Sequence, residues 1–366
     1  MSSGSVPRVG ALIRRHLREL RGQLRYAFGV LLQRLIGRRA AATRLDPGEI
    51  RSVLIGRING RLGNTLFLTP MIERLHALLP QARIDLALSY PNAAILLAGM
   101  PGVGRVILFP HKGRSLVPQY WRALRQLRST RYDLAVDPTP FSTSGRLLLC
   151  LTHARFRLGF QVPSQWAPLT HAIPVPPGTM HQGHQPAYLV TAALGARFEP
   201  ESLRLRLPIT AGETGAARAA VDAAIARGRR GGPGPRVGFF AYATGLKRLP
   251  AGWWNRFWTA LLELRPDIVP VEFLPGAATA PTVAGFASLH LRSQRELTAA
   301  IATLQLFVSA DAGPMHLASS TETPTMGLFN VTDPALYGPL KATDRSIVVP
   351  QLTPEAVAAR IHTALP

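Results

Sequence analysis

Residues 306–329 read LFVSADAGPMHLASSTETPTMGLF, and this stretch decides the fold. The run at residues 305–309 predicts a buried strand, and the run at residues 325–329 predicts another. Between them, Pro314 fits the first position of a helix over residues 314–321, where the N–H that proline lacks would have no partner within the helix. A strand, a helix and a strand of these lengths indicate a parallel sheet with a helix on its face.

The same alternation of short apolar strands and helical stretches extends over the chain from residue 50. It is typical of proteins in which helices cover both faces of a parallel sheet. The segment GGPGP at residues 231–235 breaks the pattern before a second series begins. We therefore expect an α/β protein with two Rossmann-like, doubly wound domains that face a cleft. The expected parts are a basic helical extension over residues 1–48, an N-terminal domain over residues 50–200 and a C-terminal domain over residues 201–366.

Composition limits the class of protein further. The 366 residues are 47% hydrophobic and 17% charged, which allows a sizeable core and excludes wholesale disorder. A single cysteine excludes disulfides within the chain and cysteine-based metal clusters, and it fits a reducing compartment. No uncharged run is apolar enough to cross a bilayer, and arginines interrupt the N-terminus too often for a signal peptide. We therefore expect a cytoplasmic protein.

The net charge is strongly positive, at +22 from 42 Lys+Arg and 20 Asp+Glu, and only Lys112, Lys247 and Lys341 are lysines. Such a field favours anionic partners, namely nucleic acid, an anionic membrane surface or a phosphorylated substrate. The basic segment at residues 1–48 shows no zinc pattern, heptad zipper or aromatic RNA platform, so we expect no specific nucleic-acid partner.

Residues 1–48 concentrate this charge, with ten arginines against Glu19 and Asp46. Apolar residues recur there at helical spacing and form one stripe, with the arginines beside it. The stripe consists of Ile13, Leu17, Leu20, Leu24, Phe28, Leu31 and Leu35. Two interpretations stay open: the helix attaches to an anionic membrane surface, or it docks on the body of the protein or on a second copy.

Ligands of doubly wound sheets bind at the carboxyl ends of the strands, so the loops at those ends are the candidate site. The first loop, RINGRLGNT at residues 57–65, contains Gly60 and Gly63, which allow close approach of the backbone to a ligand. Arg57 and Arg61 of this loop can hold an anionic group. The spacing matches neither GxGxxG nor a P-loop, so the loop alone is a weak signal.

Two loops of the second half carry stronger signals. Lys247 lies between a strand and a helix that begins with proline, where an ammonium can neutralise phosphate oxygens. In the other loop, Asp311 and Gly313 form the turn and His316 lies one turn into the following helix, whose free N–H groups favour an anion. The two loops together predict a phosphate site, with a purely structural role for His316 as the alternative.

These loops resemble glycosyltransferase family 9, the family of the lipopolysaccharide heptosyltransferases. Residues 54–88, the LKRLP segment at residues 246–250 and residues 306–334 carry the resemblance. The last is the most specific, because it is similar to the family's Asp-Thr-Gly-Pro-x-His-Leu-Ala block and to its Phe-Gly-x-Thr-Asp-Pro turn. The resemblance does not include the basic N-terminal segment.

The resemblance implies the GT-B fold, with the donor in the C-terminal domain and the acceptor in the N-terminal domain. It implies inverting, metal-independent transfer of a heptose from ADP-heptose to a lipopolysaccharide core or a related lipid-linked, anionic saccharide. No cofactor is implied, and the location would be the cytoplasm or the periphery of the inner membrane. The residues that would bind the donor are Thr244, Lys247, Asp311, Ala312, Gly313, Pro314 and His316. Those that would bind the acceptor are Arg57, Arg61 and Gly63.

One departure from the family concerns the catalytic base. The family's first loop ends in Gly-Asp, whose carboxylate deprotonates the acceptor, whereas this chain has Gly63 and Asn64. An amide cannot accept that proton at neutral pH. Three interpretations stay open. Asp137, at the end of the fourth predicted strand, replaces the base; Asn64 orients the acceptor while an acceptor phosphate or water takes the proton; or the protein binds a saccharide or nucleotide sugar without transferring it.

A second departure lies around the predicted donor loop. Ala312 stands where the family usually has threonine, and Asn330 stands where it usually has glycine. These changes leave the identity of the nucleotide sugar open.

Overall fold

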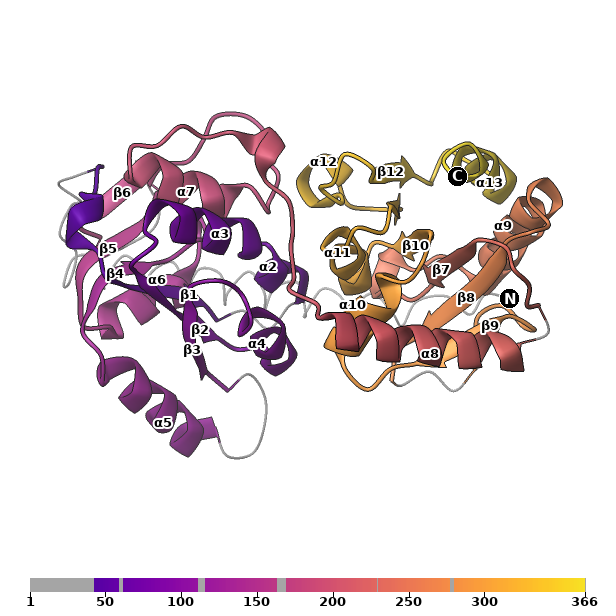
Figure 1. The fold of residues 1–366 in the computed structure, drawn as a ribbon. Coiled ribbons are helices and arrows are strands. Elements are labelled where there is room, and N and C mark those ends of the chain that lie inside the picture. The colour runs from indigo at the N-terminus through magenta and orange to yellow at the C-terminus, as the bar shows by residue number, and fades with distance from the viewer. Residues whose placement is uncertain are drawn as a thin grey trace, which may run out of the picture.

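The computed structural model describes residues 43–58, 62–110, 116–162, 169–228, 230–276 and 280–365. Within these ranges the chain forms two lobes, each built on a six-stranded parallel sheet covered by helices (Figure 1). The predicted α/β fold class with two doubly wound halves is confirmed. The stripe of residues 13–35 that predicts a basic helix lies outside the described residues, and so does Arg61.

In the first lobe the strand order is β3-β2-β1-β4-β5-β6, and all neighbouring strands are parallel. The winding reverses between β1 and β4, where ligands of such sheets bind. The strands are β1 (Ser52–Arg57), β2 (Arg83–Leu88), β3 (Val103–Leu108), β4 (Tyr132–Val136), β5 (Ala154–Gln161) and β6 (His171–Pro174). The helices are α2 (Leu62–Leu66), α3 (Thr69–Leu78), α4 (Pro91–Leu97), α5 (Leu116–Arg128), α6 (Thr143–Leu151) and α7 (Gln185–Ala193).

The second lobe repeats this topology, with the order β12-β11-β10-β7-β8-β9 and parallel neighbours throughout. Its winding reverses between β7 and β10. The strands are β7 (Arg236–Phe240), β8 (Val269–Leu274), β9 (Ala287–His290), β10 (Leu306–Ala310), β11 (Thr325–Phe329) and β12 (Arg345–Val348). The helices are α8 (Ala211–Arg227), α9 (Ala251–Leu264), α10 (Gln294–Ile301), α11 (Gly313–Ser319), α12 (Pro334–Tyr337) and α13 (Pro354–His362).

The strands at the centre of each sheet follow from their sequences, whereas some strands at the edges do not. All five residues of β10 and of β11 are buried, as expected for parallel strands with helices on both faces. The sequence patterns do not predict β6, β9 and β12. Each has only four residues and lies at or next to a sheet edge, so it leaves no periodic signal.

The two lobes are in direct contact. The Gln182 N–H donates to the Leu336 carbonyl at 3.0 Å, and the Gln294 side-chain amide donates to the Tyr90 hydroxyl at 2.6 Å. The chain crosses from one lobe to the other between α7, which packs on α3, and α8, which packs on α10. Helices α2 and α11 also meet across the interface, so the carboxyl ends of β1 and β10 face each other there.

No helix within the described ranges is long and apolar enough to span a lipid bilayer.

Candidate active site

The turn between β10 and α11 begins the candidate site. The backbone N–H of Asp311 donates to the Leu328 carbonyl of β11, which fixes the start of the turn to the sheet. Gly313 then opens α11, and a Cβ at this position would lie 2.9 Å from the Leu62 side chain of the opposite lobe. The missing side chain therefore lets α2 approach α11 closely.

The resemblance implied that Lys247 and Asp311 belong to one donor site. In the structure their side chains are in contact. Their ammonium and carboxylate groups lie 2.8 Å apart, with the lysine side chain 33% exposed and the aspartate 5% exposed. The same carboxylate oxygen of Asp311 accepts a hydrogen bond from the Thr332 hydroxyl. The ammonium is thus held in position by a buried carboxylate while it stays open to solvent.

Asn330, one of the departures from the family pattern, supports this lysine. Its side-chain amide donates to the Leu246 carbonyl at 2.6 Å, which ties the end of β11 to the turn that carries Lys247. Gly245 begins that turn with φ of +61°, a backbone conformation that favours glycine. Thr244 precedes it, is exposed, and makes no capping hydrogen bond with its side chain.

His316 lies at the boundary between the lobes. Its ring packs edge-on against Phe67 of the first lobe, with the ring centroids 4.8 Å apart. A Cβ on Gly63 would lie 2.8 Å from the Cδ2 atom of His316, so the glycine makes room for the ring. Burial lowers the pKa of His316 to about 4, with Lys247 acting in the same direction and Asp311 against it. The imidazole is therefore neutral at pH 7, and its buried Nδ1 atom has no hydrogen-bond partner among the residues that the structure describes.

The glycine loop of the first lobe thus meets the donor loop of the second lobe directly. Gly63 and Asn64 both belong to α2, and Asn64 is half-buried beside this contact. Ala312 and Pro314 lie in the same turn as Asp311 and are likewise half-buried. The structure therefore brings the residues predicted for the donor site close to the position where the family has its base.

Asp137 and Arg57 form a separate, buried cluster with Arg146, a residue that was not predicted from the sequence. The Asp137 carboxylate lies 3.4 Å from the Arg146 guanidinium and accepts from the Thr139 N–H at 3.2 Å. Burial raises the pKa of Asp137 to about 6, with Arg146 acting against it, and burial lowers the pKa of Arg57 to about 10. A Cβ on Gly145 would lie 2.4 Å from the carboxylate, so the packing around it is close.

Arg146 is a structural partner of Asp137 in this cluster. The pair favours a structural role for Asp137 over the interpretation that it replaces the catalytic base of the family. Both Asp137 and Arg146 have essentially no exposed side-chain surface. A signal for Arg146 existed in the sequence, because it begins the apolar run RLLLCL of α6, where an arginine needs a buried partner.

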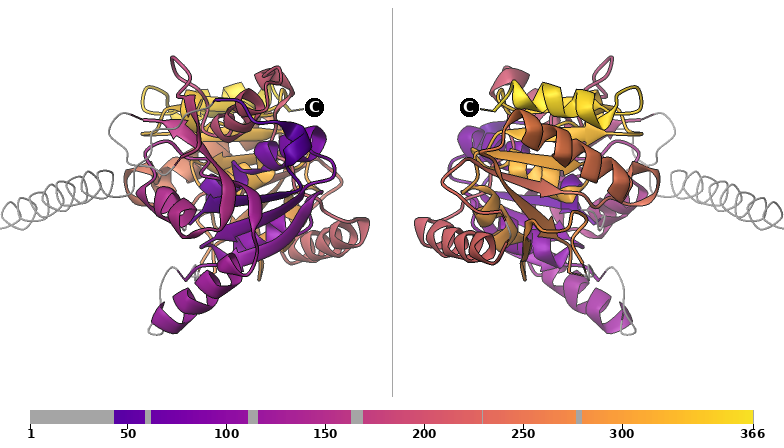
Figure 2. Two further views of the ribbon diagram at one scale, coloured as in Figure 1. Left: turned by 90° about the vertical axis from the view of Figure 1, so that its left-hand side faces the viewer. Right: turned by 90° about the vertical axis from the view of Figure 1, so that its right-hand side faces the viewer.

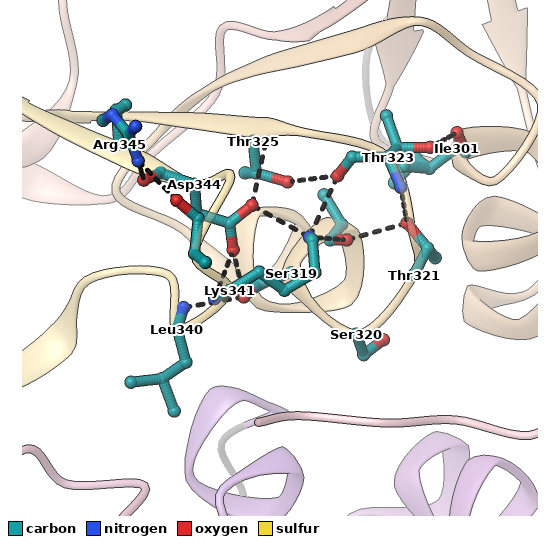
Figure 3. A network of polar contacts seen from close by, with 12 residues as sticks. Ile301, Ser319, Ser320, Thr321, Thr323, Thr325, Leu340, Lys341, Asp344 and Arg345 are labelled. Carbon is teal, nitrogen blue, oxygen red and sulfur yellow. Dashed lines mark hydrogen bonds and ion pairs between the residues drawn. The ribbon is translucent and has the colours of Figure 1, made fainter. Parts of the chain in front are cut away.

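A second buried cluster holds the other end of α11 (Figure 3). The Lys341 ammonium lies 2.9 Å from the Asp344 carboxylate and donates to the carbonyls of Ala318 and Thr323. Asp344 also accepts from the Ser319 hydroxyl at 2.7 Å. Since Ala318 and Ser319 end the helix, this lysine fixes the element that carries His316. No role of Lys341 was predicted from the sequence, although the rarity of lysine in the chain was a signal.

Among the described residues, no group of three or more histidine, cysteine, aspartate or glutamate side chains could hold a metal ion.

Comparison with known proteins shows which family the chain is similar to. Residues 287–361, which include β10, the donor loop and the Lys341 cluster, match the model of glycosyltransferase family 9 (heptosyltransferase). A curated relative, lipopolysaccharide heptosyltransferase 3 of Escherichia coli, is 23% identical over 303 residues, which cover 76% of this chain and 83% of the relative.

Solved structures show the same fold. A glycosyl transferase family 9 protein from Veillonella parvula superposes with a TM-score of 0.69 and 20% identity, covering 84% of this chain and 87% of its own. The heptosyltransferase WaaC of E. coli, solved with ADP, superposes with a TM-score of 0.67 and 18% identity, covering 86% and 99%. Together with the match to the family model, these similarities confirm the resemblance to glycosyltransferase family 9, and the solved structures show that the chain has the GT-B fold.

Proposed function

We propose that this protein transfers a heptose from ADP-heptose to a lipid-linked, anionic saccharide such as a lipopolysaccharide core, with inversion and without a metal ion or cofactor. The observation that carries the proposal is the Lys247–Asp311 pair, which presents a partly exposed ammonium beside the contact between the lobes. The ADP in the structure of the WaaC relative supports the choice of nucleotide.

The chemistry of the donor site follows from the charge that develops. When the sugar leaves, negative charge accumulates on the β-phosphate of ADP, and a fixed ammonium nearby stabilises it. Lys247 has donors to spare for phosphate oxygens while it keeps its contact with Asp311. The exposed Thr244 hydroxyl and the backbone of Ala312 and Gly313 would complete the diphosphate site.

The acceptor would enter from the side of the first lobe, against Arg57, Arg61 and Gly63. The overall charge of +22 fits an acceptor that carries phosphate groups, and it fits work at an anionic membrane surface. Asn64 would orient the acceptor hydroxyl, with an acceptor phosphate or water taking the proton. The burial of Asp137 and its pairing with Arg146 support a positioning role for Asp137, whose charge also attracts the Arg57 guanidinium at the end of β1.

The test is release of ADP from ADP-heptose by the purified full-length chain, with and without a heptose-free core oligosaccharide. We expect release that depends on the acceptor. A thermal-shift panel of ADP-, UDP-, GDP- and dTDP-sugars identifies the donor independently, because a ligand that binds only the folded chain raises Tm. A response to another nucleotide alone would overturn the choice of ADP-heptose.

Asn64 supports a second candidate function, in which the chain binds a nucleotide sugar or saccharide without transferring it. Asn64→Asp restores the carboxylate of the family pattern and is nearly isosteric, so the half-buried site should accept it. If ADP release depends on the acceptor only in this variant, the natural chain is a binding protein. If the natural chain is active and Asn64→Ala lowers its turnover, Asn64 has the orienting role proposed above.

A further inference from the structure

Helix α5 stands apart from the rest of its lobe. It connects β3 to β4, and only Ala123 and Leu127 along its length are buried. Tyr120 also contacts the body, with its ring 6.0 Å from that of Phe109 at the end of β3. Figures 1 and 2 show the helix projecting below the first lobe, away from the second. Most of its surface is therefore open to whatever lies outside the protein.

Large apolar side chains gather on the first turns of this helix. Val117 and Trp121 are 66% and 68% exposed, and they are neighbours because they lie four residues apart. Leu116 and Tyr120, beside them, are 36% and 45% exposed. Exposed apolar residues are common one at a time, but four within six positions of a projecting helix form a patch.

The charge of α5 has one sign. Arg122, Arg125 and Arg128 are all exposed, and the helix contains no acidic residue. Within the part of the chain that the structure describes, no carboxylate pairs with any of the three, and the polar contact of Arg128 is with His153. The cations are therefore available to an anionic partner.

The position of the helix also bears on its role. Since β3 runs parallel to β1, the first turn of α5 follows the same edge of the sheet as the loop after β1, where the acceptor is proposed to bind. A surface beside this edge would lie against the material that carries the acceptor.

From this combination we propose that α5 is a membrane-docking surface for anionic lipid. Trp121 and Val117 insert at the level of the headgroups, and Arg122, Arg125 and Arg128 contact lipid phosphates. Tryptophan beside arginine on an amphipathic helix is the composition that binds the interface of anionic bilayers. A symmetric contact with a second copy would bring these unpaired arginines close to their own counterparts, which opposes that alternative. The proposal goes beyond the transfer reaction and does not depend on which sugar is transferred.

The experiment measures the contact of Trp121 itself, because residues 1–48 could bind the same vesicles. Full-length wild type and Trp121→Phe are mixed with vesicles that contain brominated phosphatidylcholine, which quenches tryptophan by contact. The difference between the two proteins isolates Trp121 from the other tryptophans. We expect this difference to be quenched when phosphatidylglycerol is included and to stay unquenched in phosphatidylcholine alone. A Trp121 signal that stays unquenched while the protein sediments with anionic vesicles would overturn the proposal.

Matched variants separate the two parts of the surface. Replacing Arg122 or Arg125 by glutamine should weaken vesicle binding about fivefold for each arginine at low salt. Val117→Ser with Trp121→Ser should reduce binding further, whereas Leu264→Ser, a control on α9 at a residue 45% exposed, should not. Sedimentation without lipid tests the alternative, since a dimer that the double variant dissociates would mean that a second copy covers the helix.

The proposed transfer reaction can be tested independently of the docking surface. Trp121→Phe should release ADP at the wild-type rate with a soluble acceptor fragment, because Trp121 lies on α5 of the first lobe and Lys247 lies between β7 and α9 of the second (Figure 1). Loss of vesicle contact with this rate unchanged would count for the docking surface alone.

Discussion

Two lysine–aspartate pairs lie at opposite ends of α11, and they differ in almost everything except distance. Lys247 and Asp311 lie 2.8 Å apart at the start of the helix, and Lys341 and Asp344 lie 2.9 Å apart behind its end. The first lysine side chain is 33% exposed and the second 5%. An ammonium has three donors, and Lys341 directs them to Asp344 and two carbonyls, whereas among the described residues Lys247 contacts only Asp311.

The comparison teaches that exposure and unused donors, rather than the ion pair itself, separate a ligand-binding lysine from a structural one. A saturated, buried lysine can only hold its surroundings, because any new partner would have to replace an existing one. A half-open lysine can take up phosphate without leaving its carboxylate. The same helix therefore has a fixed end and an end open to ligands.

The largest change in the free energy of unfolding is expected from a substitution at the fixed end of α11, where Lys341 lies. Lys341→Met leaves the Asp344 carboxylate buried without its cation and removes one donor from each of the carbonyls of Ala318 and Thr323. We expect a loss of about 3–5 kcal/mol in the free energy of unfolding, measured in urea. Adding Asp344→Asn should recover part of this loss, because the isolated charge is removed. An unchanged midpoint in the single variant would show that the pair does not hold the helix.

The open end should respond in the opposite way. Lys247→Ala should change the free energy of unfolding by less than about 1 kcal/mol, since the lysine is partly exposed and its attraction to Asp311 is screened. Turnover should fall about 100-fold, the loss typical when one group that stabilises transition-state charge is removed. The neighbouring exposed cation gives the control, and Arg248→Ala should keep most of the activity. Equal losses in both variants would argue against a specific role for Lys247.

A smaller effect is expected where the helix touches the first lobe. Gly63→Ala puts a methyl group 2.8 Å from the His316 ring, and overpacking of this kind costs about 1–3 kcal/mol. We expect lower Tm and lower turnover together, because the two loops are pushed apart. The control is Gly212→Ala on α8, where a Cβ meets nothing within 4 Å. Combining Gly63→Ala with His316→Ala should restore stability if the clash is the cause.

The pH dependence of stability should be a smaller, diagnostic effect at the open end. The pKa of His316 is about 4 in the folded chain against an ordinary value of 6.5. Its contribution to the free energy of unfolding is therefore complete above pH 6.5 and is lost as pH falls through 4. Asp137 has the opposite sign, because its pKa is raised to about 6 and its contribution is lost as pH rises through 6.

These two dependences can be separated by substitution. The stability gap between wild type and His316→Asn should shrink as pH falls from 6.5 to 4. The stability of wild type relative to Asp137→Asn should rise as pH falls from 6 toward 3.8, because the folded wild type takes up a proton in this range that the unfolded chain does not. Urea titrations at several pH values measure both, and a gap that is constant with pH would contradict the burial of that group as the cause.

Much of the fold could be predicted from the sequence because it rests on local patterns. The buried runs of β10 and β11 and the proline at the start of α11 sufficed for the sheet and the donor turn. That Lys247 and Asp311 belong to one donor site was implied by a family resemblance, and their ion pair was not predicted, since the two residues are far apart in the chain. The four-residue strands β6, β9 and β12 could not be predicted, because they depend on their neighbours in the sheet.

The candidate site shows where tertiary context overrides local signals. His316 was expected to face the ligand, and its ring packs against Gly63 and Phe67 of the other lobe, a contact that no local spacing encodes. The partner of Asp137 is Arg146, nine residues on in the sequence, and the carboxylate at the end of a strand alone could not show that it was enclosed. Burial is a property of the assembled lobes.

The scarcity of lysine gives this chain a practical consequence. Acylating reagents attack unprotonated amines, and of the two lysines in the described ranges Lys341 is enclosed and fully bonded while Lys247 is open. Mass spectrometry of acylated peptides should therefore find Lys247 modified and Lys341 intact. Protection of Lys247 by an added nucleotide would report occupancy of the donor loop directly, before any acceptor or product has been identified.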